Sequence, residues 1–436
     1  MSAELDRVLE SLAARQPHLI EPSLDRIKLF VDALGAPQTS YPSIHITGTN
    51  GKTSTARMID ALLRAAHLRT GRYTSPHLER VHERISLDGE PLTDEQLVAA
   101  YDDVALIAGL IDDRSDEPLT YFELLTGMAF ATFADAPVDV GVVEVGLGGS
   151  WDATNVIDAG VAVVTPVGLD HMEFLGGTLE SIATEKSGIM RPGGLAILSS
   201  QELEAAQALL RHAVELDTTV AREGVEFGVI ARNVAVGGQL VSLQGLNARY
   251  DDVFLPLHGA HQASNAAAAL AAVEGFLAQG PLAEDLVRDG FAMADSPGRL
   301  EVVRHAPTII LDGAHNPASA AAAAAAVSEA FFFERLVGVV AILADKDAEG
   351  VLTAFEPVMT NIVVTENASP RSLPVGQLAA LAADIFGPDR VAVEKRLDDA
   401  IERAVELAEY GDTVEGGGVL VTGSLFTVGE ARHLLR

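Results

Sequence analysis

Residues 47–55 form a glycine-rich turn, Thr-Gly-Thr-Asn-Gly-Lys-Thr-Ser-Thr, between a strand-like stretch at 43–47 and a helix-like stretch at 56–68. Backbone N–H groups and the positive end of a helix favour phosphate in such a turn, Lys52 adds charge, and a hydroxyl at Thr53 or Ser54 can hold Mg²⁺. The alternative is a plain turn between a strand and a helix. The sequence therefore predicts an α/β protein with an ATP site at Gly48, Thr49, Asn50, Gly51, Lys52, Thr53 and Ser54.

The composition of the chain indicates which classes of protein it can belong to. A chain of 436 residues, 48% hydrophobic and 5% aromatic, suits an α/β protein of two or three domains. The absence of cysteine excludes disulfides, thiolate metal sites and cysteine nucleophiles. A formal net charge of −32 argues against binding to nucleic acid or anionic lipid. Without an apolar leader, a spanning segment or a leftover apolar stripe, we expect a soluble, cytoplasmic monomer that acts on small molecules and not on membranes.

Strand-like and helix-like stretches alternate after residue 43, which predicts mostly parallel sheets with right-handed crossovers. The first forty or so residues have helical apolar spacing, and residues 221–256 indicate a β-rich excursion. Turn residues at 295–298 precede a fresh alternation, so we expect one domain at 1–296 and another at 297–436. The expected buried strands after the first are 138–145, 160–167, 195–199, 308–311, 336–342, 362–365 and 418–422.

Polar residues follow several of these strands, where open α/β sheets bind ligands. Glu144 ends an apolar strand before a glycine turn and is a candidate Mg²⁺ ligand, with an ion pair at the sheet edge as the alternative. His171 ends the next strand and is placed to join Glu144, although an isolated histidine there would be an ordinary loop residue. Lys186 ends a helical stretch, where interaction with the helix C-terminus is the simpler reading.

Three further stretches carry polar groups of interest. Thr120-Tyr-Phe-Glu123 precedes a helix and predicts a capping box between Thr120 and Glu123. Thr-Ser-Pro-His-Leu at 74–78, followed by Glu-Arg-Ile at 83–85, places a hydroxyl, an imidazole and an arginine after the second strand-like segment, although a loop with a salt bridge explains it equally well. In the second domain, Arg299, Asp312 and His315 gather at a strand end and are expected to close over the nucleotide.

Taken in order, these stretches resemble the bacterial folylpolyglutamate synthases and dihydrofolate synthases of the Mur ligase superfamily, almost end to end. The resemblance implies an α/β fold with a P-loop Mur-ligase-type central domain, built on a mostly parallel sheet, and a smaller Rossmann-like C-terminal domain. The motifs that carry it are Gly-Thr-Asn-Gly-Lys-Thr, Ser-Pro-His-Leu, Thr-Tyr-Phe-Glu, Glu-Val-Gly-Leu-Gly-Gly, Asp-Ala-Thr-Asn, Gly-Leu-Asp-His, Glu-Lys-Ser-Gly-Ile, Gly-Ala-His-Gln-Ala-Ser-Asn, Gly-Arg-Leu-Glu, Asp-Gly-Ala-His-Asn-Pro, Ala-Asp-Lys-Asp and Val-Thr-Gly-Ser-Leu.

The resemblance also assigns roles to residues. It implies that Asn265, Arg299 and Asp312 complete the ATP site, and that Lys186 is carbamylated, which would turn a cation into a carboxylate-like group. It implies pterin-binding segments near residues 19–21 and at 120–123. The implied ligands of two Mg²⁺ ions are Thr53, Ser75, Glu144 and His171. The implied catalytic residues are Lys52, His171, Lys186, Asp312 and His315, and the implied substrate-binding residues are Thr120, Tyr121, Phe122, Glu123 and Asp152.

The implied activity is that of an ATP-dependent amide ligase, which adds L-glutamate to a folate, to dihydropteroate, or to both through an acyl phosphate. A cell-wall Mur ligase is one rival, but those enzymes carry a UDP-binding domain before the ATP loop, and here only residues 1–47 precede Gly48. A nucleotide-binding switch or a degenerate, non-catalytic family member is the other. Ser150 keeps that second rival open, because relatives usually carry arginine at this position.

Overall fold

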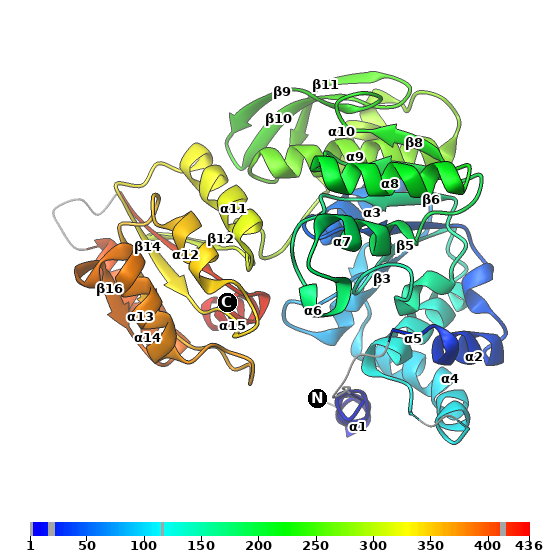
Figure 1. Cartoon of the computed structure of the whole chain (residues 1–436), viewed down its shortest axis with the longest axis horizontal. Coiled ribbons are helices and arrows are strands. Elements are labelled where there is room, and N and C mark those ends of the chain that lie inside the picture. Colours follow the sequence, from blue (N-terminus) through cyan, green and yellow to red (C-terminus); the bar gives the residue numbers. More distant parts are fainter. Residues whose placement is uncertain (1–2, 16–21, 115–116, 410–415) are drawn as a thin grey trace. The chain divides into compact units, whose positions relative to one another are not determined.

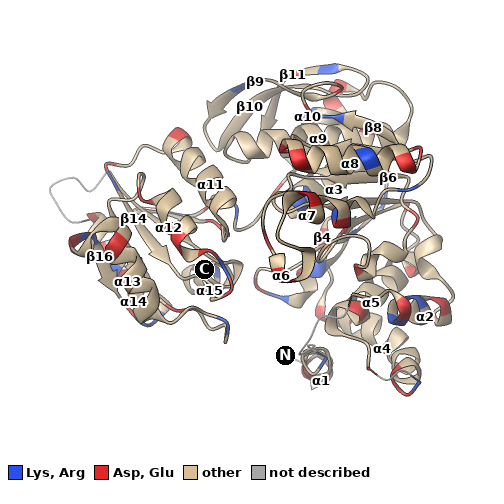
Figure 2. Ribbon diagram, in the orientation of Figure 1, with Lys and Arg blue, Asp and Glu red and all other residues tan. Residues whose placement is uncertain are grey.

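The computed structural model describes residues 3–15, 22–114, 117–409 and 416–436 (Figure 1). The chain forms two compact units, each of which is described by itself. The first unit comprises Met1–Ala231, Val241–Phe254 and Ala263–Ala294, and the second comprises Arg232–Leu240, Leu255–Gln262 and Asp295–Arg436. Acidic residues are spread over both units and outnumber the basic ones (Figure 2).

An eight-stranded sheet, in the order β4-β3-β2-β5-β1-β6-β7-β8, organises the first unit. The strands from β2 to β8 in this order pair in parallel, whereas β3 and β4 form an antiparallel edge. Every residue of β1 and β5 is buried, as expected for central strands with helices on both faces. The strands are β1 (Ser43–Thr47), β2 (Thr70–Tyr73), β3 (Ile85–Leu87), β4 (Glu90–Pro91), β5 (Val140–Glu144), β6 (Val161–Val164), β7 (Leu195–Leu198) and β8 (Thr219–Arg222).

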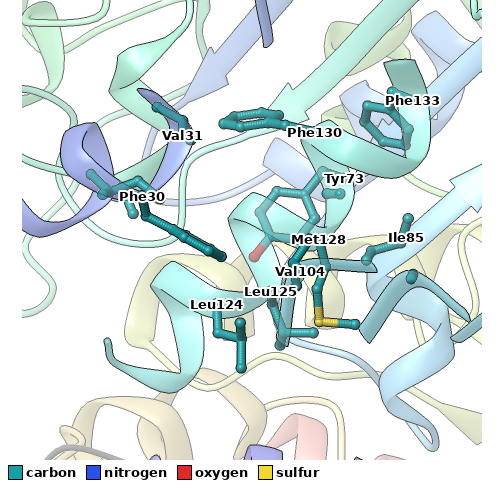
Figure 3. Close-up of a cluster of buried hydrophobic side chains, with 14 of the residues drawn as sticks. Phe30, Val31, Tyr73, Ile85, Val104, Leu124, Leu125, Met128, Phe130 and Phe133 are labelled. Carbon is teal, nitrogen blue, oxygen red and sulfur yellow. The ribbon is translucent and has the colours of Figure 1, made fainter. Parts of the chain in front are cut away.

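The helices of this unit bury apolar faces against the sheet and against one another. In Figure 3, Phe30 from α2 and Tyr73 from β2 lie among buried side chains of α5, including Met128 and Phe130. Gly127 of α5 allows this close approach, because a Cβ atom there would lie 2.2 Å from a ring carbon of Phe30. The helices are α1 (Ala3–Ala13), α2 (Asp25–Ala33), α3 (Lys52–Ala65), α4 (Asp94–Asp112), α5 (Tyr121–Asp135), α6 (Met172–Leu175), α7 (Leu179–Ser187), α8 (Leu203–Glu215), α9 (Ala260–Leu277, whose first three residues belong to the second unit) and α10 (Glu284–Ala292), with 3₁₀ turns η1 (Pro37–Thr39), η2 (Val81–Arg84) and η3 (Ala153–Val156).

A six-stranded sheet in the order β12-β13-β17-β14-β15-β16 forms the second unit, parallel except for the edge strand β12. A separate three-stranded sheet, β9 (Gly228–Ala235), β10 (Gly238–Gln244) and β11 (Arg249–Leu255), has residues in both units. The remaining elements are β12 (Glu301–His305), β13 (Thr308–Leu311), α11 (Pro317–Ala330), β14 (Arg335–Val340), α12 (Ala348–Phe355), β15 (Asn361–Val364), α13 (Val375–Phe386), η4 (Pro388–Arg390), β16 (Val391–Val393), α14 (Leu397–Glu409), β17 (Gly417–Thr422) and α15 (Leu425–Leu435).

The predicted fold class, α/β with mostly parallel sheets, is confirmed. The β-rich excursion is also confirmed, since β9, β10 and β11 lie within 221–256. The helix predicted at 56–68 was wrong at both ends. It begins at Lys52, because Gly51 takes a left-handed conformation (φ 90°) as its N-cap, and it ends at Ala65, before His67 turns left-handed. Within the described residues, no helix is both long and apolar enough to span a membrane.

Candidate active site

The candidate residues of the first unit follow strands that are neighbours in the sheet. The order β2-β5-β1-β6 places four chain segments side by side at the carboxyl edge, where open α/β sheets bind ligands. Residues 48–51 follow β1, the half-buried Ser75 follows β2, Glu144 ends β5, and residues 168–171 come after β6. The sheet topology thus brings together the loop, the carboxylate and the hydroxyl that the sequence predicted to act together.

Glycine is required at the first position of the phosphate loop. Gly48 has φ 141°, and a Cβ atom there would lie 1.9 Å from Oγ1 of Thr165. The loop is fastened to the segment after β6, because the backbone N–H of Thr49 donates to the carbonyl of Pro166 at 3.0 Å. The Thr49 hydroxyl also donates to the carbonyl of Gly168 and accepts from its N–H, at 3.0 and 2.9 Å. The loop is therefore held in a fixed shape by its neighbours.

Lys52 and Asn265 both lie against this loop. The Lys52 ammonium donates to the carbonyls of Gly48 and Thr49, at 3.0 and 3.2 Å, so its charge lies over the turn at the N-terminus of α3. Asn265, on α9, packs on Gly51 so closely that a Cβ atom on that glycine would lie 2.5 Å from the amide oxygen. A cation, a helix N-terminus and an amide side chain therefore surround one turn, as phosphate binding requires.

A half-buried hydroxyl and a buried carboxylate form a pair beside the phosphate loop. The Thr53 hydroxyl, in the first turn of α3, lies 2.9 and 3.0 Å from the two carboxylate oxygens of Glu144, which is 1% exposed. Hard oxygen ligands of this kind are the ones that Mg²⁺ prefers, and Mg²⁺ keeps several waters instead of filling its shell with side chains. The described residues contain no cluster of three or more histidine, cysteine, aspartate or glutamate side chains that could hold a metal ion.

Lys186 is buried at the end of α7, with 4% of its surface exposed. Burial lowers the pKa of its ammonium from 10.5 to about 7, and the charge of Lys52 lowers it further, against the opposing influence of Asp170 and Asp152. No hydrogen bond or ion pair to its Nζ is present among the residues that the structure describes. A substantial fraction of Lys186 is therefore a neutral amine near neutral pH, and the neutral amine is the reactive form of a lysine.

His171 caps the short helix α6 in a left-handed conformation (φ 52°), and its side chain is 42% exposed. Its backbone N–H donates to Asp170 at 2.9 Å, and its Nε2 lies 3.9 Å from the same carboxylate. The imidazole thus lies beside Asp170 in the loop after β6, the strand next to β1 in the sheet. This contact with Asp170 is compatible with both roles considered from the sequence, a metal ligand and an ordinary loop residue.

The capping box at α5 is confirmed. The Thr120 hydroxyl accepts the N–H of Glu123 at 3.2 Å, and the Glu123 carboxylate accepts the N–H of Thr120 at 2.8 Å while it also pairs with Arg26 at 3.2 Å. Tyr121 and Phe122 begin the helix, and Phe122 packs on Gly146 so closely that a Cβ atom there would lie 2.5 Å from the ring. The other predicted pterin-binding segment, residues 19–21, lies outside the described residues.

Asp152 lies in the loop after β5 and is 3% exposed. It accepts the backbone N–H groups of Leu147 and Thr154, at 2.8 and 2.9 Å, and burial raises its pKa in spite of these hydrogen bonds. Thr154 in turn bonds to Nε2 of His45 at 2.8 Å, and burial lowers the pKa of that imidazole to about 3. Asp152 thus shapes the loop that follows Glu144.

The three candidates of the second unit gather at the end of β13. Asp312 is 4% exposed, accepts the N–H groups of Leu300 and Ala314 at 3.0 and 2.9 Å, and has a pKa raised by burial, although the charge of Arg299 opposes this. Arg299 lies over Gly313, where a Cβ atom would come within 2.3 Å of its Nη1. His315 bonds through Nδ1 to the Gly313 carbonyl at 2.9 Å.

Comparison with known proteins shows the family to which this chain belongs. The Mur ligase middle domain matches residues 46–273, and the Mur ligase glutamate ligase domain matches residues 298–425. The dihydrofolate synthase/folylpolyglutamate synthase of Mycobacterium tuberculosis is 50% identical, over 99% of this chain and 94% of that protein. The chain belongs to the dihydrofolate synthase/folylpolyglutamate synthase family. The resemblance seen in the sequence is thereby confirmed, and the chain is a Mur-type ligase.

Other members of the family are also similar to this chain in sequence and in structure. The dihydrofolate synthase/folylpolyglutamate synthase of Escherichia coli is 34% identical over 95% of this chain and 92% of that protein. The structure of Mycobacterium tuberculosis folylpolyglutamate synthase complexed with ADP matches with a TM-score of 0.95 and 51% identity, over 99% of this chain and 98% of that one. The structure of the Escherichia coli enzyme in complex with DHPP and ADP matches with a TM-score of 0.86 and 32% identity, over 99% of this chain and 97% of that one.

The sequence assigned no functional role to Arg84. Arg84 was noted only as part of a loop after the second strand, with a salt bridge as the simplest explanation. The structure instead shows Arg84 buried beside Tyr121 and His77, without a carboxylate partner among the described residues. The signal that could have found it is its position, because Arg84 lies one residue before the strand that pairs with the end of β2, close in the chain to Ser75.

Proposed function

We propose that this chain uses ATP to join L-glutamate to a pterin-linked carboxylate, which is that of dihydropteroate or of the terminal glutamate of a folate. The observation that carries the proposal is the Thr53–Glu144 pair beside the Lys52 loop, in a chain that is 50% identical to a dihydrofolate synthase/folylpolyglutamate synthase over 99% of its length. The pair supplies oxygen ligands at the place where the loop would present the β- and γ-phosphates.

The reaction follows from these parts. The γ-phosphoryl group of ATP passes to the substrate carboxylate and forms an acyl phosphate, while Lys52 and the N-terminus of α3 stabilise the charge on the transferring oxygens. The amine of L-glutamate then attacks the acyl carbon, and inorganic phosphate leaves from the tetrahedral intermediate. No side chain of the protein has to act as a nucleophile, which accords with a chain that lacks cysteine.

Magnesium fits the oxygen ligands at this edge of the sheet. Thr53 and Glu144 would hold it, with Ser75 and His171 as further ligands, and the proposal allows two ions. When bound, Mg²⁺ neutralises phosphate charge. The neutral form of Lys186, favoured by burial, supports the proposal that this lysine is carbamylated, because only an unprotonated amine adds carbon dioxide.

The remaining assignments are proposals of the same kind. Asn265 completes the nucleotide site from α9, which its packing on Gly51 supports. Arg299, Asp312 and His315 contribute from a C-terminal domain at 297–436, and residues 1–296 form the ATP-binding domain. Residues 120–123 and Asp152 contact the pterin-linked substrate. We further propose that the enzyme is monomeric and works in the cytoplasm.

The test is phosphate release from ATP and Mg²⁺ with L-glutamate, compared between added dihydropteroate, added tetrahydrofolate and neither compound. Release with both acceptors would mean that one chain performs both reactions, and release with one acceptor would identify its reaction. A nucleotide-binding switch would hydrolyse ATP slowly and ignore glutamate, so glutamate-independent release would overturn the proposal. If the protein releases no glutamate-dependent phosphate, Ser150→Arg is the next variant to assay, because relatives usually carry arginine at this position. The Ser150 hydroxyl donates to the Glu185 carbonyl at 3.0 Å.

A further inference from the structure

Arg84 is a buried cation at the edge of the proposed site. It is 9% exposed and ends the 3₁₀ turn η2, directly before β3, which pairs with β2. Its backbone carbonyl accepts the N–H of Thr74 at 2.9 Å, and this bond ties Arg84 to the segment that runs from the end of β2 into Ser75. Arg84 therefore stands at the carboxyl edge of the sheet, where β2 and β5 lie between β3 and β1, the strand that the phosphate loop follows.

The contacts of Arg84 use only part of its hydrogen-bonding capacity. Its Nε donates to Nδ1 of His77 at 2.9 Å, and the guanidinium carbon lies 5.2 Å from the centre of the Tyr121 ring. A guanidinium can only donate, so His77 accepts through Nδ1 and is neutral, which agrees with a pKa that burial and Arg84 lower to about 4. The four N–H groups on the two Nη atoms have no hydrogen-bonding partner among the described residues.

Two neighbouring arginines, unlike Arg84, have carboxylate partners. Arg72 pairs with Asp60 at 2.9 Å, and Arg80, on the same loop as Arg84, pairs with Asp94 at 2.5 Å. A buried cation without an anion is costly, because desolvation is not offset by an opposite charge. The fork of Nη groups matches a carboxylate in two parallel hydrogen bonds. The Tyr121 ring beside the guanidinium and Phe122, the next residue of α5, are aromatic side chains that suit a flat ring.

We infer that Arg84 binds a carboxylate of the acceptor substrate, an aromatic acid whose ring lies along Tyr121 and Phe122. The inference rests on the proposed function, since it names the residue that would hold the substrate of that reaction. Phosphate is the weaker alternative, because the loop after β1 already provides a phosphate site. His77 and Tyr121 are positioning residues in this arrangement, one fixing Nε and the other the plane of the guanidinium.

The test compares binding of dihydropteroate with binding of its carboxamide, in which a neutral amide replaces the carboxylate. Affinities are measured by fluorescence titration for wild type, Arg84→Gln and Arg84→Lys. The control Arg80→Gln removes an exposed arginine of the same loop. We expect wild type and the control to prefer the acid by at least about tenfold, and Arg84→Gln to lose that preference while its ADP affinity stays within about twofold of wild type.

Arg84→Lys keeps the charge but loses the fork, so it should retain only part of the preference and remains informative if Arg84→Gln does not fold. A preference for the acid that persists undiminished in both variants would overturn the inference. A purely structural role for Arg84 would weaken acid and amide equally, and that result would overturn it too. If wild type bound neither compound, or released no glutamate-dependent phosphate, the proposed function would fail first, before Arg84 came into question.

Discussion

Replacement of Lys186 by methionine tests whether burial keeps this lysine neutral. Methionine has a similar length and no charge, so the variant removes the titration and little of the packing. In the folded chain, burial and the charge of Lys52 lower the Lys186 pKa from 10.5 to about 7. In the unfolded chain the same lysine titrates near its ordinary value of about 10.4.

The sign of the effect on stability follows from proton binding. Between about pH 7 and pH 10.5 the unfolded chain binds more protons than the folded chain, so the free energy of unfolding rises with pH in this window. Below pH 7 both states are protonated, and the buried charge destabilises the folded state by its full amount, about 5 kcal/mol. Between pH 6 and pH 9, Lys186 alone should therefore raise the stability of wild type by about 2–3 kcal/mol.

The assay is urea unfolding at pH 6, 7.5 and 9, followed by the fluorescence of Trp151, the single tryptophan, which packs against the apolar cluster around α7. Buffers are freed of carbon dioxide, because a carbamate would replace the amine being measured. Lys186→Met should be more stable than wild type at pH 6, by an amount that shrinks by about 2–3 kcal/mol at pH 9. Lys395→Met, at an exposed position, is the control. A pH-independent difference between wild type and Lys186→Met would refute the reasoning.

Three further predictions concern the edge of the sheet around the phosphate loop. Lys52→Ala should abolish ATP turnover in a folded protein, and near-normal phosphate release would remove the phosphate-loop assignment. Glu144→Ala should raise the Mg²⁺ concentration needed for half-maximal turnover at least about tenfold, and an unchanged metal titration would show that Glu144 is not a ligand. Gly48→Ala should weaken ADP binding and lower stability by about 1–3 kcal/mol or more, because its Cβ would collide with Thr165; wild-type ADP affinity and thermal stability would contradict this.

Local sequence patterns were sufficient to predict most of the framework. The run at 43–47 contains the β-branched residues Ile44, Ile46 and Thr47, lies between turns, and forms β1 over the same residues. The strand at 308–311 matches β13 in the same way. The capping box of Thr120 and Glu123 needs only a four-residue pattern, so it could be predicted without knowledge of the fold. In each case the information lies within a few consecutive residues.

Features that depend on distant residues could not be predicted. Glu123 pairs with Arg26, 97 residues away, and nothing in either local pattern indicates that contact. The burial of Lys186, which sets its pKa, depends on how α7 packs against the loop after β5. The start of α3 at Lys52 depends on the left-handed Gly51, which a plain count of apolar residues does not show. The role of Arg84 could likewise be inferred only from the structure, which shows its contacts with His77 and Tyr121 and no carboxylate partner among the described residues.

The paired hydrogen bonds between Thr49 and Gly168 have a consequence for binding energetics. A flexible phosphate loop would lose conformational entropy each time a nucleotide bound, and that loss would weaken the affinity. Here the loop after β1 and the segment after β6 hold each other through one hydroxyl that both donates and accepts, with the carbonyl of Pro166 as a further anchor. The ordering entropy is therefore spent when the protein folds, and the nucleotide meets a loop that is already shaped for it.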